Sequence, residues 1–338
     1  MSAITYDGTN RYIRITDIDN ETHELIDTGE TSPADFSSKY LLGEGDLLFA
    51  RTGASVGKTY FYQSNKEKQY FAGYLIKFHF KNQITGKYVF YFTQTKNYKN
   101  WVSTFSKRSG QSGINAEEYS KLKLYIPVIK EQELIVQFLE DLDKKLNIVR
   151  TKLAILKKYR KGLTKNLLFF RILIDAKPLN GCCKITTGKL DANAMKPDGK
   201  YKFFTCSKED YLIDNYAFDC EAILVAGNGE VGYTKYYKGK FNAYQRTYVL
   251  YNFKTDPFLI KTCIDLQINS VIRKETNKGT MPYIKLGTFS KIKIPNIDEK
   301  LSCDLNFLKP LNKKIFILED SLKKIKLIKQ YLLKNLFI

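Results

Sequence analysis

The feature that most constrains this chain is a heptad pattern of apolar residues between Lys130 and Phe169. Apolar residues follow one another at alternating steps of four and three, which predicts a long helix that buries one stripe against a second helix. Arg160 occupies one position of this stripe and interrupts it. The expected seam residues of the first helix are Leu139, Leu142, Leu146, Val149, Leu153 and Leu156.

The partner helix is expected in the C-terminal stretch from Leu308 to Ile338. Its seam lies 169 positions after the first one, and Lys329 interrupts it at the position that corresponds to Arg160. A chain of 338 residues, twice this offset, is therefore interpreted as a duplicated unit of a globular region followed by a long helix. Because Pro310 lies inside the pattern, the second helix is expected to kink or restart there. Its expected seam residues are Leu308, Leu311, Ile315, Leu318, Leu322 and Ile325.

The two globular halves are expected to contain the same order of elements. Each half shows a strand, two strands around a glycine turn, a further strand, a helix, a polar loop and a closing strand. The second half has roughly twenty more residues before its first matched strand, which suggests that the first half lacks an N-terminal piece. In the first half the expected first strand is 12–18, the strand pair around the glycine turn is 45–62, the further strand is 69–80, the helix is 87–106 and the closing strand is 121–127. In the second half the same elements are expected at 200–208, 221–237, 243–253, 257–275 and 291–295.

The composition favours a polyanionic partner. The formal charge is +20, which indicates nucleic acid or an anionic membrane surface. The N-terminus is polar and no run of 18 apolar residues occurs, so a soluble, cytoplasmic protein is expected. Six cysteines without metal-ligand spacing and two histidines argue against a zinc site, and reduced, buried thiols are expected. No cofactor is predicted.

Two glycine-rich segments resemble nucleotide-binding motifs only superficially. Residues 53–59, GASVGKT, have three residues between their glycines where a phosphate-binding loop needs four. Residues 227–232, GNGEVG, satisfy a dinucleotide fingerprint, but a strand pattern follows where that motif requires a helix. Both occupy the same place in the repeat, so a glycine turn between two strands explains both. The chain is expected to bind rather than to catalyse.

The sequence resembles the specificity subunit of type I restriction–modification systems. The resemblance is carried by GDLLFARTGASVGKTYFY (45–62) and by KLKLYIPVIKEQELIVQFLEDLDKKL (121–146), and it recurs in the second half in EAILVAGNGEVGYTKYY (221–237) and in KIKIPNIDEKLSCDLNFLKPLNKKI (291–315). The second copy of the helix start has departed from the first, with DEK at 298–300 where KEQ stands at 130–132.

This resemblance implies an α+β fold with two β-rich target-recognition domains, two long antiparallel helices that form a coiled coil, and a pseudo-two-fold repeat. Each domain would read one half of a split sequence in double-stranded DNA. Two copies of a DNA adenine methyltransferase subunit would dock on this scaffold, and restriction subunits can add to the complex. The expected ranges are 1–128 for the first domain, 129–172 for the first helix, 173–296 for the second domain and 297–338 for the second helix.

Polar and basic side chains on the loops of each domain are the expected DNA contacts. In the first domain they are Arg51, Ser55 and Lys58 of the glycine turn, and Lys107, Arg108, Gln111, Ser112 and Asn115 of the following loop. In the second domain they are Asn228, Glu230, Tyr233, Lys235, Gln245, Arg246, Arg273, Lys274, Asn277 and Lys278.

Two other functions are compatible with the same sequence. One is a stand-alone DNA-binding protein with two modules on a coiled-coil stalk, which would bind DNA without a methyltransferase partner. The other is an enzyme with its chemistry in the glycine turns, which would require the isolated chain to bind a nucleotide or S-adenosylmethionine.

Overall fold

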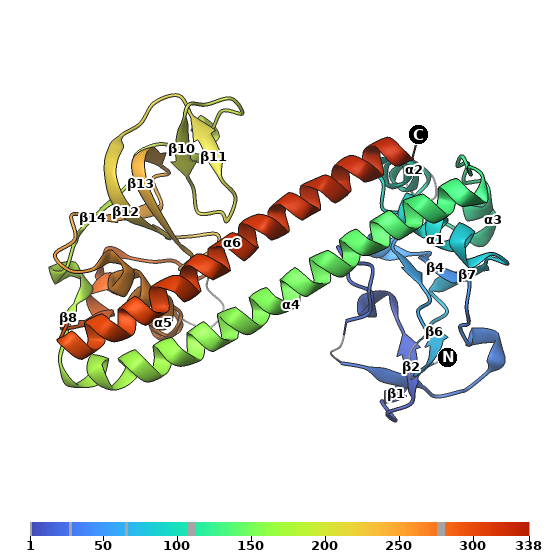
Figure 1. The fold of residues 1–338 in the computed structure, drawn as a ribbon, viewed down its shortest axis with the longest axis horizontal. Coiled ribbons are helices and arrows are strands. Elements are labelled where there is room, and N and C mark those ends of the chain that lie inside the picture. Colours follow the sequence, from blue (N-terminus) through green and yellow to red (C-terminus); the bar gives the residue numbers. More distant parts are fainter. Residues whose placement is uncertain (1, 27–28, 65–66, 107–112, 276–280, 338) are drawn as a thin grey trace. The chain divides into compact units, whose positions relative to one another are not determined.

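The computed structural model describes residues 2–26, 29–64, 67–106, 113–275 and 281–337. They form two compact units (Figure 1): unit 1 contains Met1–Thr151 and Glu319–Ile338, and unit 2 contains Lys152–Leu318. No helix in the described part of the chain is long and apolar enough to cross a membrane.

In its described residues, unit 1 contains three small sheets and three short helices beside its share of the two long ones. The paired strands are β1 (Ala3–Thr5) with β3 (Thr31–Pro33), β2 (Asn10–Ile13) parallel to β6 (Lys68–Phe71), and β4 (Asp46–Ala50) between β5 (Thr59–Phe61) and β7 (Leu75–His79). The short helices are α1 (Gln83–Phe92), α2 (Lys96–Phe105) and α3 (Ala116–Ser120).

Two expectations for unit 1 are corrected by local turn chemistry. The single helix expected at 87–106 is two helices: the first ends with Thr93 as its C-cap, and Thr95 caps the second by accepting a hydrogen bond from the backbone N–H of Tyr98. The single strand expected at 69–80 is two strands, β6 and β7, separated by a turn at Gly73 and Tyr74.

Unit 2 is built on one larger sheet. Helix α5 (Pro257–Glu275) has the bounds expected from the sequence, and β15 (Lys293–Pro295) pairs with β8 (Ala176–Pro178) in a separate ribbon. The strand order of the sheet is β11 (Tyr211–Ile213), β10 (Tyr201–Phe204), β13 (Thr234–Ala243), β12 (Phe218–Ala226), β14 (Thr247–Tyr251) and β9 (Lys184–Thr187).

The internal repeat and the α+β class are confirmed. In unit 1, β4 lies between β5 and β7, and in unit 2, β12 lies between β13 and β14 in the same antiparallel order. The parallel pair β2 and β6 likewise corresponds to β10 and β13. The strand expected at 121–127 is wrong, because no described strand of unit 1 corresponds to β8, the partner of β15.

The two long helices are α4 (Ile129–Ile174) and α6 (Glu299–Leu336). Helix α6 continues through Pro310, so the restart expected there is wrong. A proline inside a helix removes one backbone hydrogen bond. Buried side chains on both sides of it, including Leu308 and Ile315, keep the helix packed. All twelve expected seam residues are buried or half-buried.

The core of unit 1 is completed by the last turn of the chain. Ile135 and Leu139 of α4 share one buried cluster with Leu333 and with Phe337, which follows α6. The ring centroid of Phe337 lies 4.9 Å from that of Tyr88 of α1, and only 3% of Phe337 is exposed. Unit 1 therefore needs residues from both ends of the sequence.

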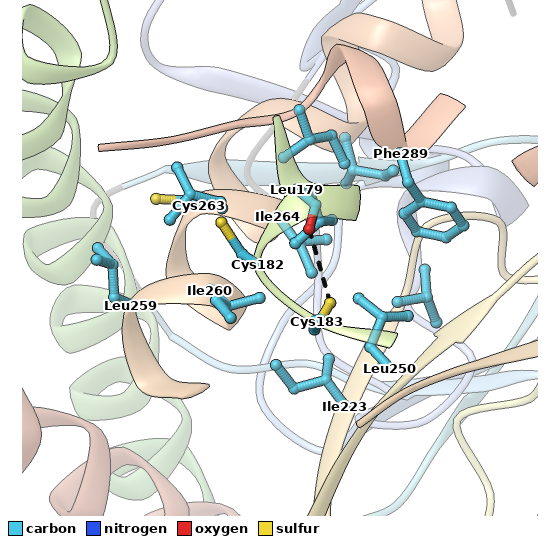
Figure 2. Close-up of a cluster of buried hydrophobic side chains, with 14 of the residues drawn as sticks. Leu179, Cys182, Cys183, Ile223, Leu250, Leu259, Ile260, Cys263, Ile264 and Phe289 are labelled. Carbon is cyan, nitrogen blue, oxygen red and sulfur yellow. Dashed lines mark hydrogen bonds between the residues drawn. The ribbon is translucent and has the colours of Figure 1, made fainter. Parts of the chain in front are cut away.

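The core of unit 2 contains three of the cysteines. Cys182, Cys183 and Cys263 lie among buried aliphatic residues (Figure 2), and the thiol of Cys183 donates to the carbonyl oxygen of Leu179 at 3.8 Å. Burial raises the pKa of Cys183 to about 12, which keeps it protonated. The cysteines are free thiols, and Cys206 is also buried, but Cys220 is only half-buried and Cys303 is exposed, so burial was predicted for too many of them.

In each unit a polar link crosses the helix pair at the position where a basic residue interrupts the seam. In unit 1, Lys329 contacts the carboxylate of Asp143 at 2.5 Å. In unit 2, Arg160 donates to the side-chain oxygen of Asn312 at 2.9 Å. Asn312 is the counterpart of Asp143 in the repeat, and Lys329 is the counterpart of Arg160, so the two links are equivalent. The link farther along α4, at Arg160, meets the earlier position on α6, which is the order expected of antiparallel helices.

Replacing Phe337 by alanine should destabilise unit 1 by about 3 kcal/mol, because a buried aromatic ring is lost and a cavity remains. Phe316→Ala is the matched control, because the side chain of Phe316 is 70% exposed, and it should change stability by at most about 0.5 kcal/mol. Urea unfolding of the full chain measures both, and equal midpoints for the two variants would contradict this role of Phe337.

Candidate nucleic-acid interface

Glycine turn 1 (residues 51–57) connects β4 to β5 through a tight set of backbone hydrogen bonds. The N–H of Ala50 donates to Lys58 O at 2.8 Å, and the N–H of Gly57 donates back to Ala50 O at 3.0 Å. Gly57 has a φ of +84°, and an added Cβ would lie 2.7 Å from Val102 of α2. The glycine is thus required by backbone conformation and by the approach of a helix.

Glycine turn 2 (residues 227–232) repeats this arrangement between β12 and β13. The N–H of Ala226 donates to Tyr233 O, and that of Gly232 donates to Ala226 O, both at 2.9 Å. Gly232 has a φ of +81° and lies against Ile268 and Ile272 of α5. The prediction that one structural cause underlies both glycine motifs is confirmed, because each is a turn between antiparallel strands that packs on a later helix of its unit, α2 in unit 1 and α5 in unit 2.

Both turns lie at a junction of three chain segments. In unit 1, Arg51 donates its backbone N–H to Tyr74 O at 3.0 Å and accepts at its carbonyl from Ile114 N–H at 2.9 Å. In unit 2, Gly227 makes the equivalent pair of bonds, to Arg246 O at 3.0 Å and from Ile284 N–H at 2.9 Å. We call these sites junction 1 (Arg51, Tyr74, Ile114) and junction 2 (Gly227, Arg246, Ile284).

The predicted site residues of unit 1 divide into three groups. Arg51 is exposed at junction 1, and Ser55 is half-buried in the turn beside it. Lys58 is directed inward, where its ammonium group donates to the carbonyl oxygens of Ile15 and Ile18 at 3.2 and 2.7 Å. Asn115 caps α3 by accepting from Glu118 N–H at 2.9 Å. Lys107, Arg108, Gln111 and Ser112 lie outside the described residues.

Most predicted residues of unit 2 gather around junction 2. Asn228 and Glu230 belong to glycine turn 2, Gln245 and Arg246 are exposed on the neighbouring turn, and Tyr233 is 38% exposed. Lys235 is held at 2.8 Å from the carbonyl oxygen of Glu209. Arg273 and Lys274 are exposed in the last turn of α5, and Asn277 and Lys278 lie outside the described residues.

The structure adds three exposed residues that the sequence reasoning missed. Tyr74, 66% exposed, stands at junction 1, and Gly73 before it was the available sign of a turn. Tyr283, 53% exposed, precedes Ile284 of junction 2. Lys208 pairs with Glu230 at 2.7 Å, and no local pattern predicts a pairing between segments so far apart in the sequence.

The sequence matches the family described as "Type I restriction modification DNA specificity domain" twice, over residues 2–158 and 174–327. These two matches cover most of the chain and coincide with its two repeated halves. The chain belongs to this family.

Individual members of the family resemble parts of the chain. The "Type I restriction enzyme EcoDI specificity subunit" of Escherichia coli is 47% identical over 115 residues, which are 33% of this chain and 24% of that protein. The "Putative type I restriction enzyme MjaX specificity subunit" of Methanocaldococcus jannaschii is 30% identical over 134 residues, 38% of this chain and 32% of that protein. The matched stretches thus span about a quarter to a third of these relatives.

A solved structure supports the fold over nearly the whole length. The type I restriction–modification S subunit from M. genitalium superposes with a TM-score of 0.68 over 99% of this chain and 90% of that one, at 15% sequence identity. At this identity the likeness concerns the fold alone.

Gly57→Ala should destabilise unit 1 more than Gly53→Ala does. Both glycines have positive φ, which costs a residue with a Cβ about 1–2 kcal/mol, but only Gly57 would also press a Cβ onto Val102. An added Cβ at Gly53 meets nothing within 4 Å. Thermal unfolding of the two variants measures the difference, and an equal or larger loss for Gly53→Ala would argue against this account of the turn.

Proposed function

We propose that this chain is the DNA sequence-recognition subunit of a type I restriction–modification complex, with one half of a split target read by each unit. The observation that carries the proposal is the three-segment junction, built twice with the same backbone bonds in a chain whose family is described as a DNA specificity domain. A formal charge of +20 suits a phosphate backbone. The role is non-catalytic: the subunit places a methyltransferase on the DNA.

The junctions offer side chains suited to base edges in the major groove. Around junction 2 lie Arg246, Gln245, Asn228 and Glu230, whose groups can pair with guanine, adenine and cytosine edges. Around junction 1 the exposed groups are Arg51 and Tyr74. The two junctions have the same backbone hydrogen bonds but different exposed side chains. This is what we expect of two surfaces that recognise different half-sites.

A second apolar stripe, in addition to the buried seam, indicates that another protein subunit binds the helix pair. Three exposed apolar positions of α4 recur in α6 at the repeat offset of 169, and none of the six belongs to a buried cluster. They lie on one side of each helix, next to the seam. We call this set the outer stripe: Phe138, Ile148 and Tyr159 on α4, and Phe307, Ile317 and Ile328 on α6.

The outer stripe supports two copies of one partner. Exposed apolar patches of this kind mark interaction sites. An exposed lysine also recurs in the stripe, Lys145 on α4 and Lys314 on α6, which suits a partner with an acidic group beside an apolar surface. We assign these faces to two copies of a DNA adenine methyltransferase subunit, and restriction subunits add to that complex.

The function is tested by the methylation pattern of cells that express the chain with and without its methyltransferase. A split, adenine-methylated motif should appear only when both are present. Replacing residues 175–295 by the corresponding segment of another family member should change one half of the motif and leave the other unchanged. An assembled, soluble complex that adds no methylation would contradict the proposal.

Phe138→Asp and Phe307→Asp should each remove one of two bound methyltransferase copies, because each places a charge in one face of the outer stripe. The double variant should bind none. Phe316→Asp is the matched control, since Phe316 is 70% exposed on α6 but its repeat counterpart, Asn147, is polar. Mass measurement of the purified complexes gives the stoichiometry, and equal loss with Phe316→Asp would refute the assignment.

A further inference from the structure

Free arginine side chains are rare in the described part of this chain. Only nine of its 55 basic residues are arginine, and eight of them lie in the described part of the chain. Three of these eight, Arg51, Arg246 and Arg273, have an exposed side chain without a hydrogen bond or ion pair. The other five bond to groups of their own unit: Arg11, Arg14, Arg150, Arg160 and Arg171.

Two of the three free arginines stand at the two junctions. The junctions contain equivalent backbone hydrogen bonds, and the arginine is the donor residue in one and the acceptor residue in the other. In junction 1 the arginine is the donor residue, since Arg51 N–H donates to Tyr74 O. In junction 2 it is the acceptor residue, since Gly227 N–H donates to Arg246 O. Each junction thus presents one guanidinium, although Arg51 directly follows β4 and Arg246 directly precedes β14, which are not equivalent strands of the repeat.

Both arginines project from a backbone that is fixed on several sides. The N–H and the carbonyl of Arg51 are both bonded, to Tyr74 and Ile114. The carbonyl of Arg246 accepts from Gly227 N–H and from the thiol of Cys206 at 3.2 Å. The turn that carries Arg246 is closed by a hydrogen bond of 2.8 Å from Thr247 N–H to Tyr244 O. An exposed side chain on a fixed backbone is prepared to bind a ligand with little loss of backbone entropy.

The chemistry of arginine identifies the ligand. A phosphate can be bound by lysine as well as by arginine, and this chain holds lysine in excess. The planar guanidinium also offers the O6 and N7 acceptors of guanine two N–H groups in a fixed fork, whereas lysine offers one ammonium group on a flexible stem. Arginine is scarce in this chain, yet a free arginine is present at both junctions. Recognition of a base explains this better than contact with a phosphate does.

We propose that Arg51 and Arg246 are equivalent specificity-determining residues, each of which reads one guanine in the half-site of its unit. The inference rests on the proposed function and adds to it which base is read in each half-site and which side chain reads it. It also predicts that each half of the methylated motif contains at least one required guanine, on either strand.

Arg51→Lys and Arg246→Lys test the inference in the full complex with the methyltransferase. Lysine keeps the charge but not the fixed fork of two N–H groups, so a contact that needs only charge would largely survive and the two-bond contact to guanine would weaken. Arg51→Lys should lower the preference for guanine over other bases at one motif position about 5- to 150-fold, from the 1–3 kcal/mol that such a contact supplies. Arg246→Lys should do the same in the other half-site, and each variant should leave the half-site of the other unit unchanged, so the two variants are matched controls for one another.

The methylation patterns test this inference and the proposed function separately. A wild-type complex that methylates a split motif, with both junction variants keeping the full guanine requirement, would overturn this inference and leave the proposed function standing. A motif half without a required guanine would overturn it for that unit. A wild-type complex without sequence-specific methylation would count against the proposed function itself.

Discussion

The antiparallel pairing of α4 and α6 is the constraint on which both units depend. The core of unit 1 combines Leu139 of α4 with Phe337 beyond α6, and the core of unit 2 combines Leu168 of α4 with Leu305 of α6. In each unit the helices thus contribute to the same buried cluster as the globular part. The pairing therefore cannot be lost from one unit without exposing apolar surface of its globular part.

The pairing is made specific by polar groups as well as by apolar ones. A charged residue in an apolar seam is costly unless a partner faces it. Lys329 has Asp143 and the ring of Tyr91, whose centroid lies 5.5 Å from its ammonium nitrogen, and Arg160 has Asn312. Burial and the Asp143 carboxylate raise the pKa of Tyr91 well above its ordinary value, so the phenol stays a hydrogen-bond donor. Both units thus have a link at the equivalent position, an ion pair in unit 1 and a side-chain hydrogen bond in unit 2.

Sequence reasoning predicted the long-range architecture better than the local details. Heptad spacing and the constant offset between the two seams are strong signals, because they persist over many turns, and they located α4, α6 and the repeat. The split between α1 and α2 depends on one cap, Thr95, and the absence of a strand at 121–127 depends on a missing partner. The junctions could not be predicted, because each is defined by backbone bonds between distant segments. For the same reason the sequence did not reveal that Lys58 is directed inward whereas Arg51 remains free.

The position of Phe337 in the core of unit 1 also sets an order of events during synthesis. Unit 2 is one continuous segment, Lys152–Leu318, whereas unit 1 joins Met1–Thr151 to Glu319–Ile338. At roughly 5–20 residues per second, on the order of 10–40 seconds separate the synthesis of Thr151 from that of Phe337. Over that interval the apolar faces of Tyr88 and Phe92 lack their final cover. Most of unit 1 is thus synthesised before unit 2, but its core can be completed only after unit 2 has been synthesised.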